Sequence, residues 1–128
     1  MADLRAKIMT LAPQIVRIFF NDKQDGDPAD PNQTLVQKDR WTSFVRTVKL
    51  AEAAGATINV TWQSGAMTTA QDRETSMRRF ADVLDALVTT SGIANLSWVT
   101  LQNEPNTPPR STGGATEVTP ERLGAMYR

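Results

Sequence analysis

The sequence predicts an α/β protein in which parallel strands alternate with helices. Apolar, β-branched runs occur at residues 15–20, 57–62 and 97–102. Amphipathic helical patterns lie between these runs, and strands that alternate with helices form parallel sheets joined by right-handed crossovers. We therefore expect the order α-β-α-β-α-β-α within 128 residues, with strands starting near positions 15, 57 and 98.

The first two helices are predicted from the spacing of their apolar residues. Residues 2–11 are expected to form a short helix with Leu4, Ile8 and Leu11 on one side. A longer helix ends before Gly55, because glycine suits the left-handed position that follows a helix. Its apolar stripe follows the i, i+3, i+4, i+7 spacing and consists of Trp41, Phe44, Val45 and Val48.

The next two helices are predicted mainly from their termini. Thr69 and Asp72 resemble a capping box at the start of the third helix, and Gly92 follows its end. Thr119 and Pro120 suit the N-cap and first position of a fourth helix. The apolar stripe of the third helix consists of Met77, Phe80, Ala81, Leu84, Leu87 and Val88.

The loops that follow the strands are expected to carry the function, because functional groups of parallel sheets gather at the carboxyl ends of the strands. These loops cover residues 21–37, 63–70 and 103–118. The first and the third exceed the usual length of about 2–6 residues for such connections. We therefore expect an elaborated binding face at this end of the sheet.

Composition excludes several classes of function. The chain has 14 basic and 14 acidic residues, so its formal net charge is zero, and it lacks the long-range attraction that brings proteins to nucleic acids or anionic membranes. No apolar run approaches the roughly 20 residues of a membrane-spanning helix. Residues 1–14 are amphipathic and do not resemble a signal peptide. The absence of cysteine leaves the compartment open.

Metals and cofactors are not predicted. The chain contains no histidine and no cysteine, which excludes imidazole and thiolate ligands and a Ser-His-Asp triad. The acidic stretch 21–32 lacks the closing glutamate of an EF-hand, so a solvated loop is expected there. Acid–base catalysis near neutral pH must therefore use a carboxylate, lysine or tyrosine.

The strongest functional pattern is Asn103-Glu104-Pro105, at the end of the third predicted strand. Pro105 cannot donate to a strand ladder and so ends the strand. Glu104 and Asn103 are then placed at the functional edge of the sheet. The same three residue types can also form a simple turn.

This stretch resembles the Asn-Glu-Pro signature of the clan A glycoside hydrolases, which are (β/α)8 barrels. In that clan the Asn-Glu pair ends the fourth barrel strand, and the second strand carries an arginine at the position of Arg17. The resemblance implies that residues 1–128 are a partial barrel domain containing strands two to four, from about the first outer helix to the start of the fourth. It also implies hydrolysis of a β-linked polysaccharide or glycoside with retention of configuration.

The resemblance implies a role for each matched residue. Glu104 is expected to be the general acid/base, and Asn103 to bind the 2-hydroxyl of the sugar. Arg17 is expected to keep the nucleophilic carboxylate ionised; a buried ion pair without a catalytic part is the alternative. The clan's nucleophile is a glutamate at the end of the seventh strand, and no residue of this chain matches it, so a fragment of the enzyme, inactive alone, is expected.

Weaker expectations concern residues near the strand ends. Asn21 shares strand parity with Arg17 and is expected either to bind a sugar hydroxyl or to form a turn. Trp62 is expected either to stack on a sugar ring or, because it alternates with Ile58 and Val60, to pack beneath a helix. Trp98 and Trp41 are expected in the core. Many clan members have a histidine near residue 62, so the family within the clan stays open.

The resemblance and the predicted sheet lead to two expectations about the binding partners of the chain. The substrate is expected to be a carbohydrate, and exposed sheet edges are expected to cause self-association if the chain folds alone. A small α/β carbohydrate-binding or interaction module, in which Glu104 only contacts ligand, is the alternative function. A complete nucleotide-binding domain is disfavoured, because no glycine-rich phosphate loop follows a strand.

Overall fold

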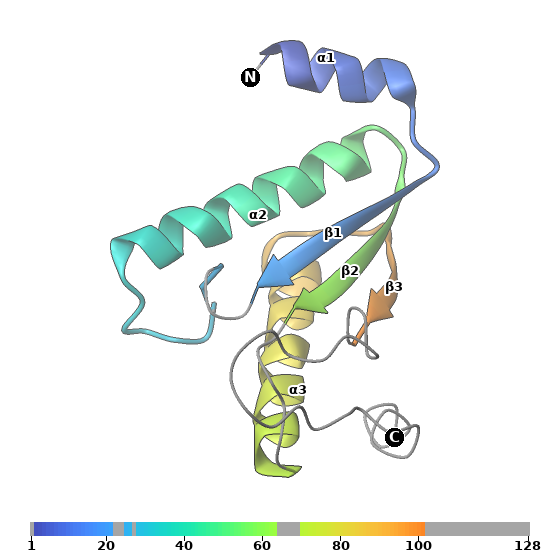
Figure 1. Ribbon diagram of the computed structural model, residues 1–128. Coiled ribbons are helices and arrows are strands. Elements are labelled where there is room, and N and C mark those ends of the chain that lie inside the picture. The colour runs from blue at the N-terminus through green and yellow to red at the C-terminus, as the bar shows by residue number, and fades with distance from the viewer. Residues whose placement is uncertain (1, 22–24, 27, 64–69, 102–128) are drawn as a thin grey trace, which may run out of the picture.

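A computed structural model describes residues 2–21, 25–26, 28–63 and 70–101. Within these ranges it confirms an α/β fold made of parallel βα units. Figure 1 shows the elements along the chain. They are α1 (Ala2–Leu11), β1 (Ile15–Asn21), α2 (Leu35–Ala53), β2 (Thr57–Gln63), α3 (Ala70–Asp85), the π-helical turn η1 (Ala86–Thr90) and β3 (Leu96–Thr100).

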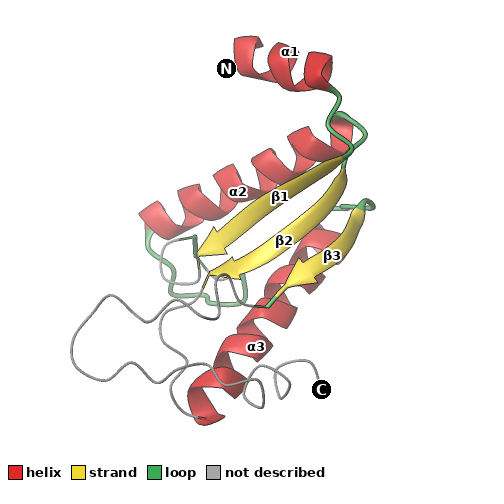
Figure 2. Cartoon of the chain, turned by 45° about the vertical axis from the view of Figure 1, so that its right-hand side comes forward, coloured by secondary structure: helices red, strands yellow, loops and turns green. Residues whose placement is uncertain are grey.

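The sheet has the order β1-β2-β3, and both strand pairs are parallel. Consecutive order with right-handed crossovers brings both connecting helices to the same face of a sheet. The ring contacts agree, because Phe20 of β1 packs on Phe44 of α2 and Trp62 of β2 packs on Phe80 of α3. Figure 2 shows the two helices beside the sheet.

An aromatic cluster forms the centre of the core between the sheet and the helices. Phe20 stacks on Trp62 with 5.3 Å between ring centroids, and Trp62 lies 4.8 Å from Phe80. Phe20 also meets Phe44 edge-on at 5.0 Å. Edge-on and offset contacts of this kind add to the stabilisation that aromatic rings gain from burial.

Helix α2 begins at Leu35, so the preceding loop is shorter than the predicted span 21–37. Thr34 is the N-cap: its hydroxyl accepts from the Gln37 amide at 3.2 Å, and the Gln37 side chain accepts from the Thr34 amide at 2.9 Å. This capping box satisfies two helix-terminal groups at once. The predicted stripe of α2 faces the core, with Phe44 and Val48 buried.

The apolar stripe of α3 is partly different from the prediction. Phe80 and Leu87 are buried as expected, but Val83 is buried in place of Ala81 and Val88, which are exposed. The physical reason is geometric, because successive residues of a helix are rotated by about 100° and only a narrow stripe can reach the strands. Glycines end both helical segments as predicted, with φ of 80° at Gly55 and 71° at Gly92.

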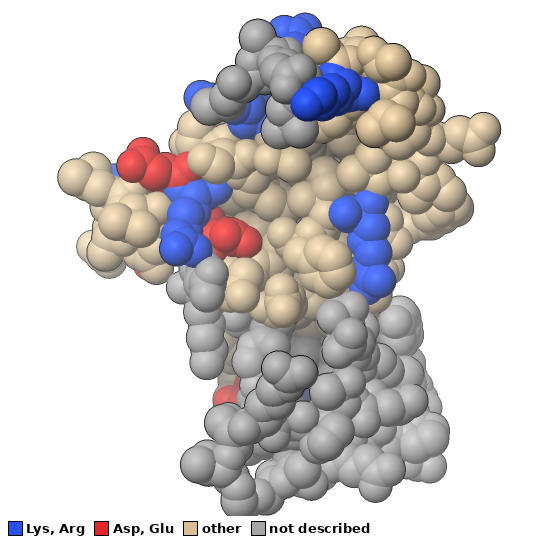
Figure 3. Space-filling model, turned by 45° about the horizontal axis from the view of Figure 1, so that its top comes forward, with Lys and Arg blue, Asp and Glu red and all other residues tan. Residues whose placement is uncertain are grey.

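Charged side chains are spread over the described surface. Figure 3 shows lysine and arginine side chains in separate places on one face, with broad areas of uncharged residues between them. Within the described ranges, no helix has the length and apolar character needed to cross a membrane.

Candidate functional site

The sheet face opposite α2 and α3 holds the described part of the candidate site. Alternation along the strands and the register between them bring one set of side chains to this face, which we call the open sheet face. Several of its apolar members are exposed, including Ile15, Phe19 and Trp98. The open sheet face comprises Ile15, Arg17, Phe19, Asn21, Thr57, Asn59, Thr61, Gln63, Trp98 and Thr100.

A polar network crosses all three strands on the open sheet face. Arg17 Nε donates to Thr61 Oγ1 at 2.7 Å. The Thr61 hydroxyl donates to Asn59 Oδ1 at 3.2 Å, and the Thr100 hydroxyl donates to the same oxygen at 3.2 Å. The network therefore joins β1, β2 and β3 through neutral groups and one cation.

Arg17 lies on the open sheet face with its side chain exposed. Its guanidinium carbon is 4.8 Å from the centre of the Phe19 ring, close enough for a cation–π interaction. Thr61, which accepts from Arg17, is 0% exposed. A hydroxyl and an aromatic ring thus orient the guanidinium, and its predicted pairing with a nucleophilic carboxylate stays a prediction.

Asn21 ends β1 on the same face as Arg17, as its parity predicted. Its backbone amide donates to Asp25 Oδ2 at 2.6 Å, and the Asp25 amide donates to the Asn21 carbonyl at 2.8 Å. This pair of bonds starts the turn that follows the strand. Binding of a sugar hydroxyl by the Asn21 side chain stays a prediction.

Trp62 is a core residue, and its proposed stacking on a sugar ring is not compatible with its position. The side chain is only 1% exposed, and the indole N–H donates to Ser76 Oγ at 2.6 Å. The reason is strand alternation: Trp62 shares parity with the buried Ile58 and Val60, which face the helices. Of the two interpretations of this residue, packing beneath a helix is the one that its burial supports.

Trp98, unlike Trp62, is an exposed residue. We expected it in the core, but it lies on the open sheet face and is 53% exposed. Ile58 pairs with Leu96 while Asn59 pairs with Trp98, so Ser97 is an extra residue in β3. An extra residue changes which side chains of a strand point to each face, and the indole is thereby placed beside Asn59.

Asn103, Glu104 and Pro105 lie outside the described residues. What precedes them is described: β3 ends at Thr100 and runs parallel to β1 and β2. Its carboxyl end is therefore at the same edge of the sheet as Asn21 and Gln63, the last residues of their strands.

Sequence reasoning missed Asn59, Thr61 and Thr100, which form most of the described network. A signal for the first two was present, because Asn59 and Thr61 alternate with the apolar residues of β2. Polar residues at every second position of a strand indicate a face that is not part of the apolar core. Thr100 could not be assigned in this way, because its face depends on the extra residue in β3.

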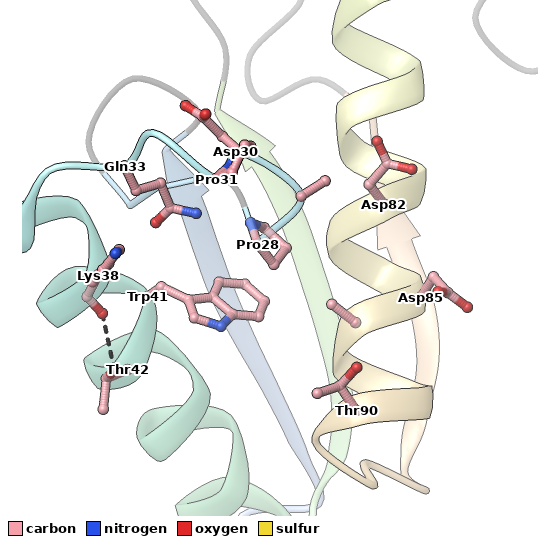
Figure 4. Close-up of a pocket in the computed structure, with 12 residues that line it drawn as sticks. Pro28, Asp30, Pro31, Gln33, Lys38, Trp41, Thr42, Asp82, Asp85 and Thr90 are labelled. Carbon is pink, nitrogen blue, oxygen red and sulfur yellow. Dashed lines mark hydrogen bonds between the residues drawn. The ribbon is translucent and has the colours of Figure 1, made fainter.

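A hollow of about 520 Å³ lies on the helix side of the sheet, away from the open sheet face. In Figure 4, Trp41 lies between Pro28 of the loop and Thr90 at the end of η1, and the Asp85 carboxylate points away from Trp41. The hollow mixes apolar and charged residues of both signs. No group of three or more potential ligands that could hold a metal ion occurs among the described residues.

Comparisons with known proteins give no assignment. No protein-family model matches the chain, and neither a curated protein nor a solved structure matches it.

Proposed function

We propose that this chain is a segment of a retaining glycoside hydrolase with a (β/α)8 barrel. The observation that carries the proposal is that Asn103-Glu104-Pro105 follow the third of three parallel strands in the sequence, separated by two residues from its end at Thr100. Two further observations support it. Both connecting helices lie on one face of the sheet, as the outer helices of a barrel do, and Arg17 lies on the other face.

In the proposed reaction, Glu104 gives its proton to the glycosidic oxygen while a second carboxylate attacks the anomeric carbon. Glu104 then removes a proton from the water that hydrolyses the glycosyl-enzyme intermediate. Asn103 binds the 2-hydroxyl, and Arg17 favours the ionised form of the attacking carboxylate. The nucleophile is proposed to belong to a part of the enzyme other than these 128 residues.

The proposed substrate contacts are revised by the fold. Asn103, Arg17 and Asn21 remain candidates, whereas Trp62 is left out because its indole is buried. The proposed substrate remains a β-linked polysaccharide or glycoside, and the proposal names neither the sugar nor the linkage.

The test is hydrolysis of aryl β-glycosides by a polypeptide that extends this chain through the remaining barrel strands. We expect Glu104→Gln to lower kcat for a p-nitrophenyl glycoside by about 10²- to 10⁴-fold, the range for loss of a general acid. The decrease in kcat should be smaller for a dinitrophenyl glycoside, because its leaving group needs no protonation. Glu117→Gln, in the same predicted loop, is the matched control and should keep its activity.

Two results would contradict the proposal. Unchanged kcat in Glu104→Gln would remove the acid/base role of Glu104. Strong Glu104-dependent hydrolysis by the 128-residue chain alone would show that the second carboxylate is present in this chain, which would overturn the proposal of a partial barrel.

A small carbohydrate-binding module without catalysis is the second candidate. The observation in its favour is the exposed indole of Trp98 beside the amide of Asn59, since sugars offer both an apolar ring face and hydroxyl groups. Binding of oligosaccharides that survives Glu104→Gln, with no hydrolysis by the extended polypeptide, would favour this function over the first.

We also propose that the isolated chain self-associates. In the described part of the sheet, β1 and β3 are the outer strands, and the open sheet face exposes large apolar residues. Unpaired strand edges and apolar patches both promote association between copies.

A further inference from the structure

The core has an incompletely covered flank beside β3, at the edge of the sheet (Figure 2). Val60 of β2 and Val99 of β3 are register partners, so their side chains point to the same face, the one that packs on the helices. Val60 is 0% exposed, whereas Val99 is 41% exposed. Because residue type and face are the same, the difference shows that the described helices cover β2 and leave β3 partly uncovered.

The end of α3 and η1 continues this uncovered flank. Ala86 and Val88 precede and follow the buried Leu87, and residues two positions apart in a helix project to roughly opposite sides. Ala86 lines the hollow beside Trp41 of α2. Val88, which is 48% exposed, therefore faces away from α2.

Two further residues of α3 share the flank of Val88. Ala81 and Leu84 precede it with the i, i+3, i+7 spacing that returns to one side of a helix. Ala81 is exposed, and Leu84 is partly buried at the edge of the core. We call Ala81, Leu84, Val88 and Val99 the α3–β3 stripe. It consists entirely of apolar side chains.

The order of the elements indicates what can cover the α3–β3 stripe. In a parallel sheet with right-handed crossovers, the helix that follows a strand lies on the same face as the preceding helix and beside it. Helix α3 lies next to α2 in this way, and the stripe is on the other side of α3. The stripe is therefore where a helix that follows β3 is expected.

The sequence after β3 contains a segment of matching pattern. Residues 119–128 lie outside the described residues, and the sequence predicts a helix that starts at Thr119. Leu123, Met126 and Tyr127 then fall on one side of it, at i, i+3 and i+4. At 1.5 Å per residue this segment is about 15 Å long, which exceeds the roughly 10 Å between Ala81 and Val88.

We propose that residues 119–128 pack on the α3–β3 stripe as an amphipathic helix. A segment of the same chain is favoured over a second copy, because its tether gives it a local concentration in the millimolar range. The inference concerns the helix side of the sheet and does not depend on any reaction of Glu104. Docking anchors the far end of the segment that carries Asn103 and Glu104, whose near end follows β3.

The test is the rate at which a single cysteine of the 128-residue chain reacts with N-ethylmaleimide, a neutral reagent. The chain contains no cysteine, so Val88→Cys places one thiol on the stripe. Val36→Cys, at a valine of α2 that is 62% exposed, is the control for an uncovered position. Dividing each rate by the rate in denaturing urea removes differences in intrinsic reactivity between the two thiols.

We expect the Val88→Cys thiol to react about 10-fold more slowly than the Val36→Cys thiol, because the docked segment must open before the reagent reaches it. Adding Leu123→Gln should restore the fast reaction, since it removes an apolar contact without adding a charge. Ala125→Gln, on the opposite side of the predicted helix, is the matched control and should leave the protection unchanged.

Three results would overturn the proposal. Equal corrected rates for Val88→Cys and Val36→Cys would mean that the stripe is uncovered. Protection that grows with protein concentration would mean that a second copy covers it. Protection that survives Leu123→Gln, or is lost equally with Ala125→Gln, would mean that the predicted apolar side of residues 119–128 does not make the contact.

Discussion

Ser76 is the single acceptor found for the indole N–H of Trp62 among the described residues, with 2.6 Å between Nε1 and Oγ. Both residues are buried, so water cannot replace the lost partner easily. This bond connects α3 to the next-to-last residue of β2, beside the ring contacts that join the sheet to both helices.

Ser76→Ala should therefore lower the free energy of unfolding by about 1–3 kcal/mol, the cost of leaving a buried donor without an acceptor. Ser43→Ala, at an exposed position of α2, should change stability by less than about 0.5 kcal/mol, as is usual for surface substitutions. Urea denaturation of the two variants measures the difference. Equal midpoints for both variants would show that the bond contributes nothing.

Substitutions at Gly26 and Gly55 distinguish the cost of backbone strain from the cost of steric contact. Both have positive φ, 78° and 80° respectively. A Cβ added at Gly26 would lie 2.7 Å from the Gln33 Oε1 atom and 2.7 Å from the Gln37 carbonyl oxygen, whereas one added at Gly55 would meet nothing within 4 Å.

Gly55→Ala should cost about 1–2 kcal/mol of stability, the strain of a left-handed non-glycine residue. Gly26→Ala should cost about 2–5 kcal/mol, because overpacking against the backbone adds about 1–3 kcal/mol to the same strain. Thermal or urea unfolding of both variants tests this order. A smaller loss for Gly26→Ala than for Gly55→Ala would contradict the packing of the loop onto the start of α2.

At the scale of elements, the start of α2 is defined by its capping box. Thr34 and Gln37 each accept from the backbone amide of the other. The loop after β1 therefore passes into α2 at a definite residue, and this determines where the helix lies over β1 and β2.

Thr34→Ala should destabilise the chain by about 0.5–2 kcal/mol, the range for loss of a side-chain N-cap. Thr34→Ser should retain most of the stability, because serine offers the same acceptor. Thr42→Ala is the control: among the described residues, the Thr42 hydroxyl bonds only to the Lys38 carbonyl within its own helix, and such bonds do not stabilise helices. Circular dichroism during urea unfolding distinguishes the three variants.

The elements themselves were largely predictable. Strands over 15–21, 57–63 and 96–100 agree with the apolar runs to within one or two residues, because β-branched and aromatic clusters of that length favour strands. The stripe of α3 was less predictable. An amphipathic helix can bury similar numbers of apolar residues in several orientations about its own axis. The strands on which the helix packs decide which orientation is adopted.

At the scale of the whole molecule, one face of the sheet is covered by helices and the other exposes apolar side chains. Ile15 is 53% exposed on the open sheet face, and Val88 is 48% exposed in η1. This pair of β-branched residues, similar in exposure but distant in the fold, allows self-association through the open sheet face to be tested.

The isolated chain should form dimers or larger species whose proportion rises with concentration in light-scattering measurements. Ile15→Lys should reduce association, because a charge opposes burial of the face, whereas Val88→Lys should not. A monomer at every concentration, or equal effects of the two substitutions, would contradict association through this face.

The candidate site was predictable only in part. Arg17 and Asn21 were placed on a common face from strand parity alone, and that placement is confirmed. The parity of Trp62 with Ile58 and Val60 favoured its burial without deciding it, and the exposure of Trp98 depends on the extra residue in β3. An indole suits the core and a binding surface equally well, so its residue type does not reveal which face of a strand it occupies.

The amino-acid sequence by itself determined the alternation of strands and helices, the positions of the glycines that end the helices, and the parity of Arg17 and Asn21. The tertiary structure alone decided which residues of different strands become neighbours. It brought Arg17 beside Asn59 and, through the extra residue in β3, moved Trp98 onto the same face. The reason is that successive side chains of a strand point to alternate faces, which the sequence of one strand reveals. Register and bulges depend on pairing between distant segments.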